Sequence, residues 1–159
     1  MTSDPEQTKV HIDLPNHWAT GGEAMWAKSL GDDLYVIDNV PFYAYGINYG
    51  DVVRATADGP DLKASVREVV RASGHSTLRI FFDTLALEKQ LEVLGQLENL
   101  NASYERATDA YVAIDIKPTG DAQKVRELLA ELEALELLEY ETCEARVEGS
   151  FDDVPEKSP

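Results

Sequence analysis

The segment from Ser73 to Arg79 carries the side chains best suited to catalysis. His75 lies next to Ser76, and a histidine beside a hydroxyl could act as a general base that activates a nucleophile. Adjacent residues of a strand point to opposite faces, so His75 and Ser76 diverge, and the sequence has no G-x-S-x-G elbow. We predict no catalytic residue and expect His75 to form hydrogen bonds that fix a linker. An enzyme centred on His75 stays an alternative, and His75 and Arg79 are binding candidates.

A second unusual segment, residues 41–51, is rich in aromatic side chains. It contains Tyr43, Tyr45 and Tyr49 and ends with Asp51. Tyrosine combines a large contact area with a polar tip, which is typical of binding surfaces. The same rings could instead cap the end of a small barrel. The three tyrosines and Asp51 are therefore binding candidates, and the choice between site and scaffold stays open.

Acidic residues dominate the chain. Asp and Glu number 30 against 14 Lys and Arg, which gives a net charge of -16. Nucleic acids and anionic membranes need clustered cations, so neither is an expected partner. Glu127 and Glu131 are like charges four residues apart on an expected helix, and Glu133 follows them. These three glutamates are the candidate contact surface for a basic protein, although solubility alone would also explain them.

The sequence lacks the residues that metal or cofactor chemistry would need. The single cysteine, Cys143, and three histidines do not supply a four-ligand zinc cluster. His11 and Asp13 share a strand face, but a metal would need further ligands. We expect no metal and no cofactor. The first residues lack the features of a signal peptide and no apolar run is long enough to span a membrane, so we expect a cytoplasmic protein.

The candidate residues lie in two halves of the chain that have different sequence patterns. Together these patterns predict the α+β fold class. Residues 8–75 are rich in glycine and turn signals and predict a small antiparallel β-barrel. Its expected strands are 9–14, 23–30, 34–37, 52–57 and 62–71. Disordered polar tails are expected at residues 1–7 and 150–159, and the second of them is acidic.

The second half, residues 76–149, predicts a ferredoxin-like β-α-β-β-α-β domain. Leucines spaced by three or four residues predict helices over 85–100 and 122–135, the second capped by Asp121. The expected strands are 77–82, 102–107, 110–117 and 138–147. Alternation places one set of side chains on the sheet face away from the helices, to be covered by the barrel, by a second copy in a homodimer, or by a ligand. This set is Arg79, Phe81, Tyr111, Asp115, Tyr140 and Glu144.

Several runs together resemble a family of short bacterial proteins known as a domain of unknown function. They are residues 26–42, with the pattern W-x-x-x-L-G-x-x-x-Y-x-x-x-N-x-P-F, then Tyr45-Gly46, residues 50–55 and residues 73–79. The resemblance spans roughly residues 8–149. It implies that these positions form one signature, and it implies no reaction.

Three classes of function remain open. The first, favoured by the charge, is a non-enzymatic acidic binding protein, such as an immunity or antitoxin-like inhibitor of a basic partner protein. The second is a small-ligand sensing domain, by analogy with other ferredoxin-like domains. The third is the enzyme centred on His75.

Overall fold

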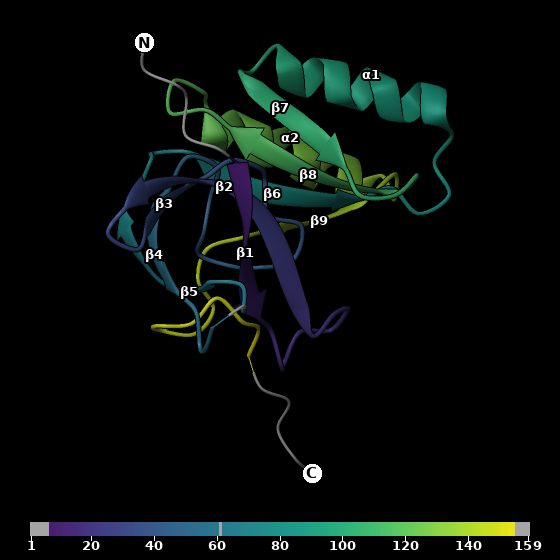
Figure 1. The fold of residues 1–159 in the computed structure, drawn as a ribbon. Helices are drawn as coiled ribbons and strands as arrows, with labels where there is room; N and C mark the ends of the chain where they lie inside the picture. Colours follow the sequence, from purple (N-terminus) through teal and green to yellow (C-terminus); the bar gives the residue numbers. More distant parts are fainter. Residues whose placement is uncertain (1–6, 61, 155–159) are drawn as a thin grey trace. The chain divides into compact units, whose positions relative to one another are not determined.

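The computed structural model describes residues 7–60 and 62–154, which form two compact units (Figure 1). The first contains the chain up to Ser73 together with the segment that begins at Glu144. The second is Gly74–Cys143. The described residues contain two helices and two sheets, which confirms the mixed α+β class. None of these helices is long and apolar enough to cross a membrane.

Five strands form the sheet of the first unit. They are β1 (Gln7–Asp13), β2 (Gly22–Gly31), β3 (Leu34–Ile37), β4 (Val52–Thr56) and β5 (Ser65–Arg71). Consecutive strands pair antiparallel, and the ladder closes on itself because β1 also pairs with β5. That last pairing is parallel, through His11 and Ser65. The other four pairings are antiparallel, as the sequence predicted.

Alternation along the strands builds the core of this unit. Val10 and Ile12 of β1 and Met25 and Ala27 of β2 point inward and are buried. The fifth strand starts later than predicted. Leu62 is exposed, and its N–H donates to the carbonyl of Gly59, because a turn occupies the start of the expected strand.

The structure differs from the predicted ending of the chain. The last strand stops at Thr142 instead of Val147, and residues 150–154 belong to the first unit. The Tyr45 N–H donates to the Phe151 carbonyl at 2.9 Å, and the Asn16 N–H donates to the buried Asp152 carboxylate at 2.8 Å. The acidic composition of this segment predicted a tail, but a backbone N–H donor compensates the burial of the Asp152 carboxylate. The rest of that predicted tail, 155–159, and residues 1–6 lie outside the described residues.

The second unit has one four-stranded sheet and two helices. In chain order its elements are β6 (Ser76–Phe81), α1 (Leu87–Glu98), β7 (Ala102–Arg106), β8 (Tyr111–Ile116), α2 (Ala122–Ala134) and β9 (Glu139–Thr142). The strand order is β7-β8-β6-β9, and all three pairings are antiparallel. Strands β7 and β9 therefore form the edges of this sheet.

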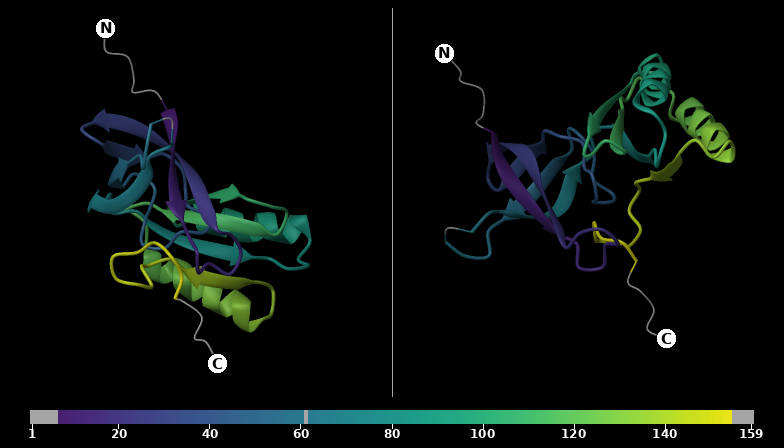
Figure 2. Two further views of the ribbon diagram at one scale, coloured as in Figure 1. Left: turned by 60° about the horizontal axis from the view of Figure 1, so that its bottom comes forward. Right: turned by 90° about the vertical axis from the view of Figure 1, so that its right-hand side faces the viewer.

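Both helices cover the same face of this sheet, as the second view in Figure 2 shows. Leu94 and Leu97 of α1 and Val125 and Leu129 of α2 are buried against alternate residues of β6 and β8. The predicted cap of α2 is confirmed, since the Asp121 carboxylate accepts the Lys124 N–H at 3.0 Å. Apolar burial at helical spacing thus fixes both helices on the sheet.

The opposite face of the sheet is polar in part and mostly buried. Arg79, Tyr111 and Asp115 lie there and are buried, as alternation predicts. Two assignments to this face were wrong. Tyr140 pairs directly with Ile80 and packs against the helix-side core, because directly opposite residues share a face. Glu144 lies beyond the end of β9 and belongs to the first unit.

Candidate functional site

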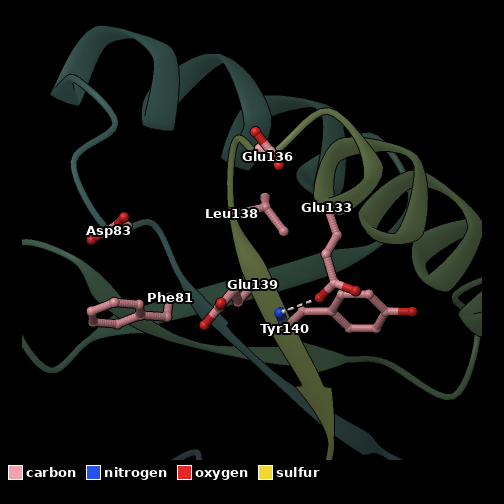
Figure 3. A pocket seen from close by; sticks show the side chains of 7 residues that line it. All are labelled: Phe81, Asp83, Glu133, Glu136, Leu138, Glu139 and Tyr140. Carbon is pink, nitrogen blue, oxygen red and sulfur yellow. Dashed lines mark hydrogen bonds between the residues drawn. The ribbon is translucent and has the colours of Figure 1, made fainter.

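The second unit contains an acidic groove at the start of β9 (Figure 3). It encloses about 890 Å³ and is lined by four carboxylates, two aromatic rings and one leucine. The lining residues are Phe81, Asp83, Glu133, Glu136, Leu138, Glu139 and Tyr140. None of them is cationic. A groove of this size and composition suits a cationic ligand that also has apolar surface.

The end of α2 positions two of the carboxylates. The Glu136 N–H donates to the Glu133 carbonyl at 2.9 Å, and the Leu137 N–H donates to the Leu132 carbonyl at 3.1 Å. These two bonds form a Schellman motif, in which Glu136 adopts the left-handed conformation with φ 59°. Glycine is the usual residue at this position. The chain therefore has a glutamate at a position where glycine would adopt the required backbone conformation with less strain.

Glu133 also protects the edge of the sheet. Its carboxylate accepts the Tyr140 N–H at 3.1 Å, which occupies a backbone donor of edge strand β9 (Figure 3). Substitution of Glu133 would therefore affect the strand and the groove together. Glu136 and Glu139 are better positions for testing the groove alone.

The predicted acidic surface is only partly in this groove. Glu133 lines it, whereas Glu127 and Glu131 lie further back on α2 and do not. Glu127 instead accepts a hydrogen bond from the amide of Gln123 at 3.1 Å. Sequence reasoning missed Asp83 and did not single out Glu136 and Glu139 as site residues. The available signal was Phe81-Phe82-Asp83, where an aromatic pair and an acid end a strand.

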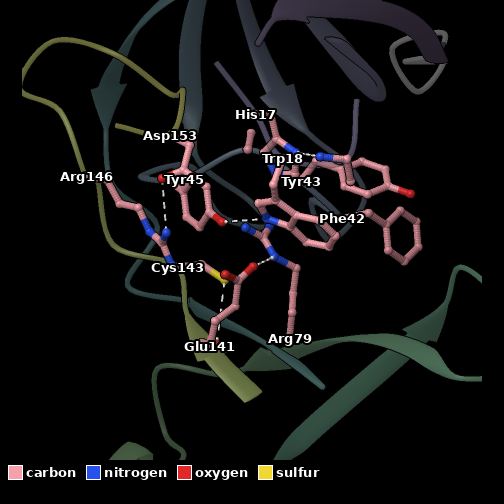
Figure 4. Close-up of polar contacts among 12 residues, drawn as sticks. His17, Trp18, Phe42, Tyr43, Tyr45, Arg79, Glu141, Cys143, Arg146 and Asp153 are labelled. Atoms are coloured by element: carbon pink, nitrogen blue, oxygen red, sulfur yellow. Dashed lines mark hydrogen bonds and ion pairs between the residues drawn. The ribbon is translucent and has the colours of Figure 1, made fainter. Parts of the chain in front are cut away.

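The predicted tyrosine loop lies in the first unit, and its rings differ in burial. Tyr45 is fully buried, whereas Tyr43 and Tyr49 are partly buried. The indole N–H of Trp18 donates to the Tyr45 hydroxyl at 3.4 Å, and the Arg146 guanidinium stacks 4.2 Å from the centre of the Tyr45 ring (Figure 4). Tyr45 is thus held by contacts within the first unit.

The neighbours of this tyrosine include a histidine and an ion pair. His17 stacks on Trp18, whose side chain is 62% exposed, with ring centres 5.1 Å apart. Arg146 donates to the Asp153 carboxylate at 3.0 Å. Burial raises the pKa of Asp153, but the Val154 N–H, Arg146 and His17 together hold it below its ordinary value. These contacts join the C-terminal segment to the first unit.

Asp51, another candidate, serves the backbone of the same unit. Its side chain is 1% exposed and accepts N–H groups from Asn48 and Ser73, both at 2.8 Å. The Ser73 hydroxyl donates to the Tyr49 carbonyl at 2.7 Å. The carboxylate therefore joins the loop to the end of the unit, and its oxygens are committed to those bonds.

Gly46 provides a test of the scaffold role of this loop. Its φ is 76°, and a Cβ there would lie 2.8 Å from the Ala145 Cβ. We expect Gly46→Ala to lower the free energy of unfolding by about 2–3 kcal/mol, through backbone strain and overpacking. Urea denaturation measures the loss. Adding Ala145→Gly should restore the overpacking part only, and full stability in Gly46→Ala would contradict the close contact.

His75 pairs with a carboxylate of the second unit. Its Nδ1 lies 2.8 Å from Oδ1 of Asp115, a residue of β8. Burial raises the pKa of Asp115 above its ordinary value, although His75 and Lys117 oppose this effect. In a catalytic histidine, a carboxylate on Nδ1 orients the ring in the same way. The neighbouring hydroxyl that such a histidine would activate belongs to Ser76, which is the first residue of β6 and pairs with Ile116 of β8. The contact agrees with the expected hydrogen-bonding role.

Arg79 is buried and paired. Its Nε donates to the Glu141 carboxylate at 2.9 Å across the β6–β9 pairing (Figure 4). Burial lowers the pKa of Arg79, but Cys143, Tyr111 and Glu141 outweigh it and leave the pKa above its ordinary value. The guanidinium therefore stays charged and is held by an acid on the neighbouring strand.

Metal binding finds no support in the described part of the chain. No group of three or more His, Cys, Asp or Glu side chains there is arranged to hold a metal ion. His11 instead bonds Asp13 at 2.8 Å.

Comparison with known proteins identifies a family but no reaction. A family model described as a domain of unknown function, DUF4265, matches residues 23–140. No curated protein matches the sequence. A crystal structure of a hypothetical protein from Neisseria gonorrhoeae has the same fold, with a TM-score of 0.73 and 14% identity. The match covers 87% of this chain and 95% of the other.

Proposed function

Because this chain belongs to the DUF4265 family, whose description names no reaction, we propose a function from its own side chains. The protein is a non-enzymatic acidic binding protein that engages a basic partner protein, in the manner of an immunity or antitoxin-like inhibitor. The observation that carries this proposal is the groove lined by four carboxylates and no cation. Opposite charge would speed association and select basic partners.

The charge of the whole chain supports this assignment. A net charge of -16 attracts basic proteins over a long range, and the groove offers the surface on which such a protein would bind. The volume of about 890 Å³ also lies within the range of small-molecule sites, which favours the sensing domain as a second candidate.

We also propose the finer description of the fold. The closed ladder of β1 to β5 supports a small barrel. The element order β-α-β-β-α-β and the strand order β7-β8-β6-β9 support a ferredoxin-like second unit. In this description the groove lies where the last strand of the ferredoxin-like unit begins.

The proposal predicts that charge in the groove matters more than charge elsewhere on α2. The groove variant combines Glu136→Gly with Glu139→Gln, and the matched control combines Glu127→Gln with Glu131→Gln. Both pairs remove two negative charges. We expect the control to capture the same basic proteins from cell extract as the unmodified protein, and the groove variant to lose them. Mass spectrometry of the captured proteins, repeated over a series of salt concentrations, measures this.

Glu136→Gly also serves as a control for misfolding as the cause of lost capture. Glycine relieves the left-handed conformation, so this change alone should raise stability by up to about 1 kcal/mol while it removes a groove carboxylate. Lost capture by a more stable protein would be a binding effect. Equal capture by the groove variant and the control would leave the high charge as a matter of solubility.

A further inference from the structure

One wall of the groove places an aromatic ring beside a carboxylate. Phe81 of β6 and Glu139 of β9 are directly opposite in the antiparallel ladder. Side chains in that relation share a face, with Cβ atoms about 5 Å apart. Figure 3 shows the Glu139 carboxylate on the side of the strand where Phe81 lies, whereas Tyr140 points the other way. The Phe81 side chain is 44% exposed, so its ring is open to a ligand.

We propose that this pair recognises an arginine side chain of the basic partner protein, an inference that rests on the proposed function. The guanidinium pairs with the Glu139 carboxylate, and its plane stacks on the Phe81 ring. Arginine suits this site better than lysine because its cation is flat, weakly hydrated and able to bond a carboxylate through two N–H groups.

The other carboxylates extend the site along the partner chain. Asp83 follows Phe81 by two residues, and Glu136 stands at the end of α2, so further cations near the first arginine also meet acids. The groove is larger than one side chain, which fits a short segment of a protein better than a single small cation. The occupant is therefore an arginine-rich segment of a partner protein.

The test uses two peptides of equal charge, hexa-arginine and hexa-lysine, titrated into the full-length protein by calorimetry. We expect hexa-arginine to bind about tenfold more tightly, which is the size of a partly desolvated cation–π contact. Phe81→Ala should abolish that preference, because it weakens the binding of hexa-arginine more than that of hexa-lysine. Glu139→Gln should weaken both peptides. Circular dichroism of each variant checks that the fold is kept.

The possible results separate this inference from the proposed function. If both peptides bind equally to the unmodified protein, and the groove variant weakens both, arginine recognition is wrong and the proposed function stands. If Glu136→Gly with Glu139→Gln changes neither affinity, the groove is not the binding surface and both proposals fail. If free spermine displaces hexa-arginine from the protein at an equal concentration, the occupant of the groove is a small cation and not a protein segment.

Discussion

Glu23→Ala is expected to lower the free energy of unfolding of this protein by about 4 kcal/mol. Glu23 lies on the inward face of β2, in line with Met25 and Ala27, and is buried. Its carboxylate accepts the N–H groups of Phe42, Tyr43 and Ala44 at 2.7, 3.0 and 2.9 Å. Alanine would leave all three donors without this acceptor, and each such loss costs about 1–3 kcal/mol.

Glu23→Gln is the matched control for this change. Phe42 bonds one carboxylate oxygen, and Tyr43 and Ala44 share the other, so a glutamine oxygen can keep the shared pair. Its stability should therefore fall between the unmodified protein and Glu23→Ala. Urea denaturation gives the free energies, and hydrogen exchange at the three amides shows whether the loop opens locally. Unchanged exchange at these amides in Glu23→Ala would contradict the anchoring role.

Local periodicity was enough to predict most of the elements. The leucine spacing placed both helices within two residues of their observed ends, since each helix buries one stripe on the sheet. Strand alternation and runs of β-favouring residues likewise identified β1 to β8. These features depend on neighbours within one element, which the sequence displays directly.

Features set by long-range pairing could not be predicted in this way. The face of Tyr140 depends on its register against Ile80, more than fifty residues away, so alternation within its own strand misplaced it. Residues 150–154 looked like a tail because their fixed partners, Asn16 and Tyr45, lie far off in the sequence. The same limit hid the Phe81–Glu139 pair, which exists only through the β6–β9 ladder.

The signature segments and the groove have different roles. Asp51 and Gly46 stand in runs that the sequence analysis grouped as one signature, and both hold the loop of the first unit in place. The groove residues come from the second unit, at the ends of β6 and α2 and the start of β9. Changes in the two sets should therefore separate cleanly, with loss of stability from the first and loss of binding from the second.

Asp51→Ala is the sharpest case of the first kind, with an expected loss of about 3–5 kcal/mol. The side chain is almost completely buried, so water cannot replace it at the N–H groups of Asn48 and Ser73. One amide lies within the loop and the other lies just after β5, so losing their common acceptor removes the link between these two segments. Urea denaturation should show the loss, and hydrogen exchange at Asn48 and Ser73 should quicken more than exchange within α1.

Two controls distinguish anchoring from binding at Asp51. Asp51→Asn keeps one oxygen for one amide and places an N–H against the other, so it should recover at most half of the lost stability. Ser73→Ala removes the hydroxyl bond to the Tyr49 carbonyl, keeps the Ser73 N–H and should cost about 1 kcal/mol. Hexa-arginine should bind folded Asp51→Asn as tightly as the unmodified protein, because the groove is in the other unit. A stable Asp51→Ala protein that no longer bound the peptide would make Asp51 a site residue after all.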